Sequence, residues 1–95
     1  MGKLVRDRIP ELIGTDCKYR VLSEQEYEQE LYKKLQEEVS ELLADPDSLE
    51  ELVDVFTVLT TIVQVKGISD KDLALAIFKK GLEKGLFEER YYLEN

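Results

Sequence analysis

The stretch LQEEVSELLADPDSLEELVDVF, from Leu35 to Phe56, decides the fold because two helical patterns flank a single proline. The first pattern stops at DPDS, where Pro46 and its neighbouring aspartates favour a turn over a continuing helix. Ser48 and Glu51 then form a Ser-x-x-Glu capping box, which starts a second helix. The stretch therefore predicts a helical hairpin that turns at Pro46 and carries acidic residues within its apolar stripes.

Further capping signals place the other helices. SEQE forms a second capping box ahead of the first pattern, and SDKD offers a serine or an aspartate as the cap of a third helix. Glycines end the second and third patterns, and Pro10 permits at most a short helical turn near the amino terminus. We expect helices over about Glu24 to Ala44, from Ser48 to about Lys66, and from Ser69 or Asp70 to near Gly85.

These helices predict an all-α fold. The loops are short enough to make consecutive helices antiparallel, so we expect a small antiparallel helical bundle in a single domain over residues 1–95. The second helix is apolar nearly all round, because Val58 and Val65 widen its main stripe, and so small a chain buries little surface alone. We therefore expect a homodimer or homotetramer to complete the fold. The main stripe of this helix contains Leu52, Val55, Phe56, Leu59, Ile62 and Val63.

Composition narrows the possible functions. The net charge of -8 disfavours a nucleic acid polymer as partner, because its phosphates need a basic surface, and points towards cations. The chain has no histidine, which excludes histidine-based triads and histidine-ligated zinc but leaves hard cations at oxygen ligands. A single cysteine, no apolar amino-terminal run and no long uncharged run predict a cytoplasmic protein without a membrane partner.

One acid of the first long helix lies on the face that the fold needs to bury. At about 100° per residue, Glu38 falls in a narrow stripe with Leu31, Leu35 and Leu42. Glu38 therefore occupies a core position. A structural ion pair with a lysine such as Lys34 is the competing interpretation of this glutamate.

The acids are symmetric about the turn. Glu41 and Glu51 lie five residues from Pro46 on either side, and Glu38 and Asp54 lie eight. Helix axes roughly 8–10 Å apart let such side chains converge. Four clustered carboxylates repel one another, and Mg²⁺ compensates them while leaving positions for water and substrate phosphate. The spacing therefore predicts a magnesium site, which Mn²⁺ could also occupy.

The acidic motifs resemble those of a known family. EEVSE, from Glu37 to Glu41, followed by ELVD, from Glu51 to Asp54, is similar to the EExxE and ExxD pair of the MazG-like all-α nucleoside triphosphate pyrophosphohydrolases. The opening KLVRDRIPELI and the closing KKGLEKGLFEERYYL resemble the ends of its small phosphoribosyl-ATP pyrophosphohydrolase-like members. The resemblance implies Mg²⁺-dependent hydrolysis of a nucleoside triphosphate to the monophosphate and pyrophosphate, as a means of clearing aberrant nucleotides.

The resemblance also implies roles for individual residues. Glu38, Glu41, Glu51 and Asp54 match the metal-binding positions, and Glu37 matches the first glutamate of the motif, which the spacing alone would leave in solvent. Two departures from the family pattern concern other residues. Lys84 replaces an arginine after the matching Lys80, and Thr57 stands where relatives often carry a further acid.

The residues suggest how such hydrolysis would proceed. Either Glu38 or Glu41 would orient or deprotonate a water, while basic residues near both ends neutralise the departing pyrophosphate, unless they are simply solvated. Phosphoribosyl-ATP or dUTP are alternative substrates, and a catalytically silent dimerisation or regulatory module is the alternative outside enzymes. The basic residues are Lys3, Arg6, Arg8, Lys80 and Lys84.

Overall fold

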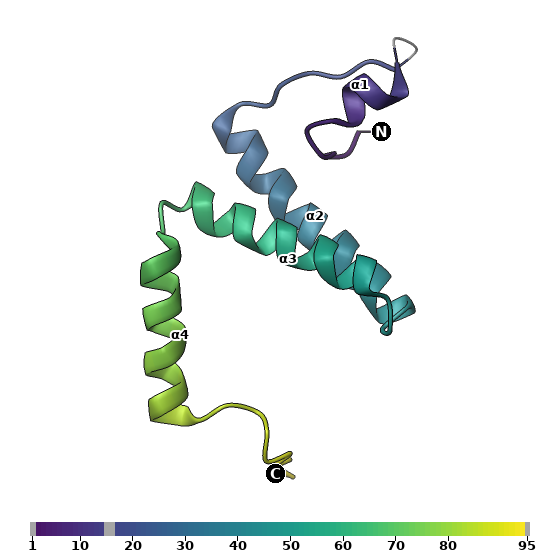
Figure 1. The fold of residues 1–95 in the computed structure, drawn as a ribbon. Helices are drawn as coiled ribbons and strands as arrows, with labels where there is room; N and C mark the ends of the chain where they lie inside the picture. Colours follow the sequence, from purple (N-terminus) through teal and green to yellow (C-terminus); the bar gives the residue numbers. More distant parts are fainter. Residues whose placement is uncertain (1, 15–16, 95) are drawn as a thin grey trace.

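The chain forms helices and no strands within residues 2–14 and 17–94, the part that this computed structural model describes (Figure 1). This architecture confirms the predicted all-α class. The helices are α1 (Ile9–Ile13), α2 (Glu24–Ala44), α3 (Leu49–Val65) and α4 (Asp70–Lys84).

Serine caps begin the three long helices, as the sequence predicts. The side-chain oxygens of Ser23, Ser48 and Ser69 each accept a hydrogen bond from a backbone N–H three residues later. Ser69, rather than Asp70, is therefore the cap of α4. Gly85 ends α4 with a φ of 80°, a conformation that costs glycine little because it has no side chain.

The helices α2 and α3 are joined by the turn at Pro46. They run in opposite directions and pack against each other (Figure 1). Among the described residues, no other pair of helices is in contact. Their interface buries Leu31 from α2 with Val58 and Ile62 from α3. The predicted hairpin is therefore the packed centre of the fold. Leu4, Tyr27 and Leu35 are partly buried against this core.

The face of α3 that meets α2 differs in part from the predicted main stripe. Ile62 belongs to that stripe and is buried, but Val58, from the flank, is buried beside it. Phe56, in the middle of the predicted stripe, is 64% exposed. The physical reason is that a helix apolar nearly all round has more apolar surface than one neighbouring helix can cover.

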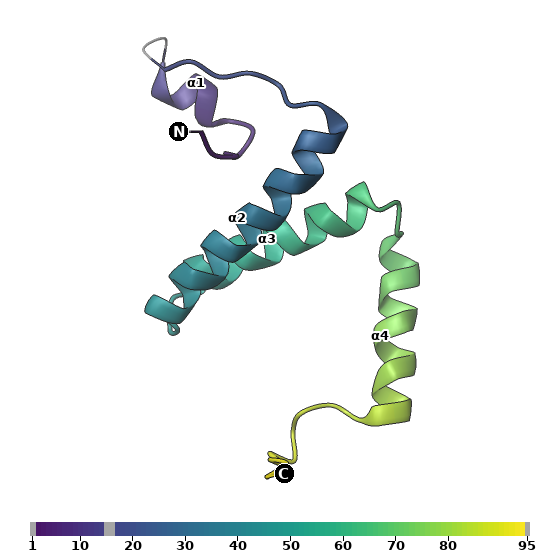
Figure 2. The ribbon, with the colours of Figure 1, turned by 180° about the vertical axis from the view of Figure 1, so that it is seen from behind.

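The fourth helix, α4, stands apart from the hairpin in opposite views (Figure 1, Figure 2). It makes an angle of 109° with α3, after a turn at Gly67, and contacts no other described helix. The expectation of antiparallel neighbours thus holds for α2 with α3 but is wrong for α3 with α4. As a result, the radius of gyration is 17.1 Å, against about 12–13 Å for a compact chain of this length.

Within the described ranges, no helix taken singly has the length and apolar character needed to cross a membrane. Only α3 and α4 counted together reach that length and composition, and the 109° bend separates them.

Candidate metal centre

Three acidic side chains from the two packed helices converge in the hairpin. Glu38 and Glu41 lie one turn apart on α2, and Glu51 lies in the first turn of α3. One carboxylate oxygen from each lies within 4.8 Å of the other two. We call these three residues the acidic cluster. They are three of the four acids that the symmetry about Pro46 predicts to converge.

Glu38 is the buried member of the acidic cluster, with 6% of its surface exposed. Lys34, one turn earlier on α2, places its Nζ 3.3 Å from Glu38 Oε1 and 3.4 Å from Glu37 Oε2. The second oxygen, Glu38 Oε2, is buried and has no hydrogen-bond partner. The structural pair with Lys34 therefore exists, but it leaves half of this carboxylate unsatisfied.

Glu51 joins the acidic cluster instead of completing its capping box. Its backbone N–H donates to Ser48 Oγ at 3.2 Å, as the box requires. The N–H of Ser48, however, donates to the carbonyl oxygen of Asp45 at 3.1 Å, and Glu51 Oε2 is buried without a partner. Only half of the predicted box forms, because the Glu51 carboxylate lies towards Glu38 rather than the start of its own helix.

Burial and repulsion disfavour the charged forms of these acids. Desolvation raises the pKa of Glu38 above its usual 4.5; a hydrogen bond from Lys34 opposes this rise and Glu41 adds to it. Desolvation also raises the pKa of Glu51, with further contributions from the charges of Asp54 and Glu38. A nearby cation would stabilise both carboxylates and engage their unused oxygens.

The donors of the acidic cluster fit a hard divalent cation. Ligands on opposite sides of a bound Mg²⁺ or Ca²⁺ lie roughly 4–5 Å apart, in agreement with the 4.8 Å that encloses the three oxygens. All three donors are carboxylate oxygens, the ligands that such ions prefer. Glu41 is exposed, so one side of the site is open to water and ligands. The acidic cluster can therefore hold a metal ion.

Asp54, the fourth predicted ligand, makes a different contact. A guanidinium N–H of Arg6, from the segment before α1, donates to Asp54 Oδ1 at 2.5 Å. Asp54 lies three residues after Glu51 on α3 and its charge helps to raise the pKa of Glu51, but Asp54 is not one of the three converging residues. Its role as a ligand stays a prediction, and Arg6 occupies its carboxylate in this structure.

Thr57 provides Arg6 with a second acceptor, a role that the sequence interpretation missed. Thr57 Oγ1 lies 3.4 Å from the same nitrogen of Arg6 and donates to the carbonyl oxygen of Val53 at 2.8 Å. In the sequence, Thr57 stands out only as a position where relatives often carry a further acid. The sequence does contain a signal for this contact: Thr57 lies three residues after Asp54, and residues one turn apart share a helix face.

The remaining predicted phosphate-binding residues do not meet at the acidic cluster. Arg8 pairs with Glu11 at 2.7 Å, and Lys3 is exposed. Lys80 and Lys84 are exposed on α4, which packs against neither helix of the hairpin. Within the described part of the chain, Arg6 alone of the predicted basic set contacts a predicted metal ligand.

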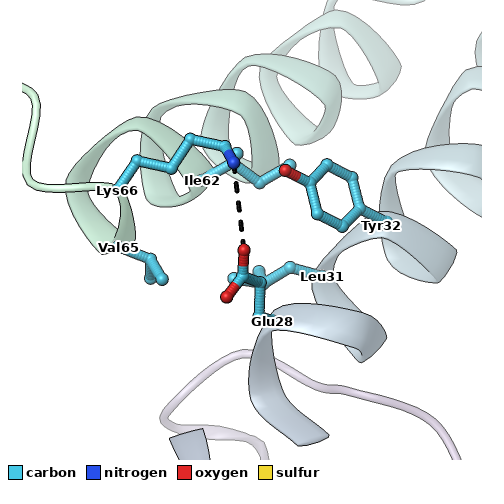
Figure 3. Close-up of a pocket in the computed structure, with 6 residues that line it drawn as sticks. All are labelled: Glu28, Leu31, Tyr32, Ile62, Val65 and Lys66. Carbon is cyan, nitrogen blue, oxygen red and sulfur yellow. Dashed lines mark ion pairs between the residues drawn. The ribbon is translucent and has the colours of Figure 1, made fainter. Parts of the chain in front are cut away.

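At the end of the hairpin far from the acidic cluster, Glu28 forms an ion pair with Lys66. Glu28 Oε1 lies 3.8 Å from Lys66 Nζ, which also lies 5.5 Å from the centre of the Tyr32 ring (Figure 3). Leu31, Ile62 and Val65 complete the lining of this recess, which has no room for a water-sized molecule. The side chains of the hairpin therefore fill this recess.

Models of protein families, curated proteins and solved structures all fail to match this chain or its fold. The acidic cluster and the motifs of the sequence are therefore the features of this chain that bear on its function.

Proposed function

We propose that this chain is a Mg²⁺-dependent nucleoside triphosphate pyrophosphohydrolase of the MazG-like type. The observation that carries the proposal is the convergence of three carboxylate oxygens from two helices within 4.8 Å, two of the three residues having a buried oxygen without a partner. The resemblance of the acidic motifs supplies the reaction class. It also suggests the biological role, the removal of aberrant nucleotides in the cytoplasm.

The acidic cluster would hold the ion through Glu38, Glu41 and Glu51. When bound, Mg²⁺ or Mn²⁺ supplies positive charge to triphosphate oxygens and lowers the pKa of a coordinated water. The chain itself carries a net charge of -8 and repels a polyphosphate, and a cation between them would offset this repulsion.

Two glutamates of the acidic cluster would act on the attacking water in different ways. Glu41 is exposed, so its carboxylate can accept a proton from a water that enters from solvent. Glu38 is buried and fixed by Lys34, so it orients rather than exchanges protons with solvent. The water oxygen bonds to phosphorus, the phosphoanhydride bond breaks, and pyrophosphate leaves with the electron pair of that bond.

Arg6 is the basic residue best placed to bind the substrate phosphates. Its side chain is 55% exposed while it pairs with Asp54 beside the acidic cluster, so a phosphate can reach it. A guanidinium binds phosphate in a bidentate manner, which favours transfer of Arg6 from Asp54 to the substrate. Asp54 then becomes available as the fourth metal ligand.

The experiment that tests this function measures pyrophosphate release from a panel of nucleoside triphosphates that includes dUTP, together with phosphoribosyl-ATP. We expect release with Mg²⁺ and a loss of about two orders of magnitude or more in Glu38→Gln. Glu30→Gln is the matched control, because Glu30 lies on the same helix and pairs with Lys33 at 3.0 Å outside the acidic cluster. This control should retain activity.

The panel also decides among the alternatives. Preference for phosphoribosyl-ATP or dUTP would narrow the substrate within the same metal chemistry. A wild-type protein that is inert with every substrate, in both Mg²⁺ and Mn²⁺, would contradict the proposed enzyme and leave the silent dimerisation or regulatory module.

A further inference from the structure

Arg6 connects the segment before α1 to the metal centre. Its guanidinium donates to Asp54 Oδ1 at 2.5 Å and lies 3.4 Å from Thr57 Oγ1. Asp54 follows Glu51, a member of the acidic cluster, by one turn of α3. Arg6 therefore holds the one acid of the four predicted ligands that lies outside the acidic cluster.

The backbone on both sides of Arg6 is anchored independently of its side chain. Leu4, two residues earlier, is partly buried against the core between α2 and α3. The carbonyl oxygen of Arg6 accepts a hydrogen bond from the N–H of Ile9 at 3.1 Å, where α1 begins. These contacts leave the guanidinium free to change partner while the backbone stays in place.

The ion pair between Arg6 and Asp54 is one that a ligand can break. The guanidinium donates to the carboxylate through one nitrogen, whereas the strongest arginine–carboxylate pairs use two. The side chains of Arg6 and Asp54 are 55% and 26% exposed, so water competes for both partners. Exposed ion pairs of this kind shift an equilibrium by no more than roughly fivefold. The pair therefore biases the position of Asp54 without fixing it.

Thr57 supports this pair without adding a second charge. Its Oγ1 is itself held in place, because it donates to the carbonyl oxygen of Val53 at 2.8 Å. An acid at this position would hold the guanidinium with a second negative charge and would oppose its release. With threonine there, one carboxylate and one hydroxyl hold Arg6, and the pair stays easy to open.

The pair alters the charge that the metal centre offers to a cation. While Asp54 is paired, its negative charge is offset by the positive charge of Arg6. A released Asp54 adds a fourth carboxylate and one unit of negative charge beside the acidic cluster. The affinity of an oxygen-ligand site for a divalent cation rises with the number of its charged ligands. The state of Arg6 therefore sets the affinity of the metal centre.

A phosphate group is the ligand suited to open this pair. A guanidinium binds phosphate through two parallel hydrogen bonds, which replace the single one to Asp54. Coupling between two binding sites is reciprocal. A phosphate that takes Arg6 therefore strengthens metal binding by the same factor by which the metal strengthens phosphate binding.

We propose that Arg6 is a releasable latch on the metal centre. It withholds Asp54 from the metal in the free protein and yields it when a phosphate group binds the guanidinium. The metal ion and the substrate phosphates then bind cooperatively, and the free protein holds its metal weakly. The proposal rests on the metal centre of the proposed function but does not depend on hydrolysis.

Isothermal titration calorimetry with Mg²⁺ alone tests whether Arg6 competes for Asp54. At physiological salt, where charges more than about 8 Å apart are screened, Arg6→Gln should bind Mg²⁺ roughly fivefold more tightly than the wild type. Arg8→Gln is the matched control and should bind as the wild type does. Arg8 carries the same charge in the same segment but pairs with Glu11 at 2.7 Å. Circular dichroism should show equal helix content in all variants.

A double-mutant cycle separates competition for Asp54 from the simple loss of a positive charge. In an Asp54→Asn background, Arg6→Gln should leave the Mg²⁺ affinity nearly unchanged, because the contested ligand is absent. Thr57→Val removes the second acceptor of Arg6 and should give an affinity between those of the wild type and Arg6→Gln. An undiminished gain in the Asp54→Asn background would overturn the latch, and so would wild-type affinity in Arg6→Gln.

Inorganic phosphate tests the release of the latch. In excess phosphate, the affinity of the wild type for Mg²⁺ should approach that of Arg6→Gln, while chelation of Mg²⁺ in solution affects both titrations equally. A difference that phosphate leaves unchanged would contradict the proposal. A wild type that binds Mg²⁺ without these Arg6 effects overturns the latch alone and leaves the proposed function standing. Failure of every variant to bind Mg²⁺ would overturn the metal centre and the latch together.

Discussion

The pKa values of two glutamates in the same helix, α2, are shifted in opposite directions. At the start of α2, Glu26 accepts hydrogen bonds from Arg20 at 2.9 Å and from Ser23, and these contacts, with Arg20 first, lower its pKa to about 2. Twelve residues later, Glu38 is buried and one of its oxygens has no partner, so its pKa is raised. The local structure is helical at both positions, and the difference comes entirely from the neighbours.

The two kinds of glutamate differ in whether the chain itself satisfies their carboxylates. Glu26 is satisfied by its own chain and stabilises the helix start as it is. The charged forms of Glu38 and Glu51 are costly in the isolated chain, and either protonation or a bound cation would relieve that cost. A protein that keeps such costly groups in its small core is expected to use them in function.

The largest expected effect is on hydrolysis. Glu51→Gln should lower Mg²⁺-dependent pyrophosphate release by about a hundredfold or more, because it removes a donor of the acidic cluster. Glu26→Gln should stay within about twofold of the wild type, since this glutamate lies outside the cluster. Steady-state assays of both variants make the measurement. Equal losses would show that the two regions do not differ in function.

The next effect is stabilisation by metal. Mg²⁺ at a hundred times its dissociation constant should stabilise the folded chain by about 2.7 kcal/mol, because it binds the native acidic cluster. Differential scanning calorimetry should then show a rise of roughly 10–20 °C in Tm. Glu26→Gln should keep this rise and Glu38→Gln should lose it. The absence of any rise in the wild type at millimolar Mg²⁺ would count against the metal centre.

The two glutamates should also give opposite pH dependences in metal-free protein. The pKa of Glu38 is raised in the folded state, so its stabilising contribution is complete below 4.5 and is lost as pH rises through the folded pKa. Glu38→Gln should therefore melt at a higher temperature than the wild type near pH 8, with the difference closing towards pH 4.5. Thermal melts at a series of pH values, all in chelator, check this outcome.

Glu26 has the reverse sign. Its pKa is lowered to about 2, so its contribution is complete above 4.5 and is lost as pH falls towards 2. Glu26→Gln should therefore be less stable than the wild type at neutral pH, and the difference should close in acid. Variants that respond to pH in the same direction would show that the two glutamates have similar surroundings.

The smallest effect concerns the two capping boxes. Ser23→Ala should lower the free energy of unfolding by about 1 kcal/mol, because Ser23 takes part in a complete box with Glu26. Ser48→Ala should cost less, about 0.5 kcal/mol, because Glu51 has left that box for the acidic cluster. Urea titrations monitored by circular dichroism measure both values. A larger cost for Ser48→Ala would mean that its half-formed box is the stronger cap.

The local structure could be predicted because its causes are local. Each serine cap acts on a backbone N–H three residues away, and Pro46 breaks the helix by its own covalent geometry. Periodicity also placed Glu38 in the buried stripe, since a residue in line with Leu31 and Leu35 must share their face. The acidic cluster followed from that periodicity and the symmetry about Pro46.

Three features depended on tertiary structure. The hydrogen-bond partner of Asp54 is Arg6, which lies 48 residues earlier in the chain, and no local pattern specifies such a contact. The face of α3 that meets α2 could not be predicted, because a helix apolar nearly all round offers several equivalent faces. The position of α4 depends on the turn at Gly67, whose angle holds α4 away from the hairpin of its own chain.

Sequence alone therefore determined the helices, their caps and the spacing of the acids, since these arise from interactions within a few residues. Tertiary structure decided which acids converge, which acid Arg6 holds and which apolar faces remain uncovered. Those outcomes depend on the competition among faces for a limited packing surface, and a single α2 can cover only one side of α3.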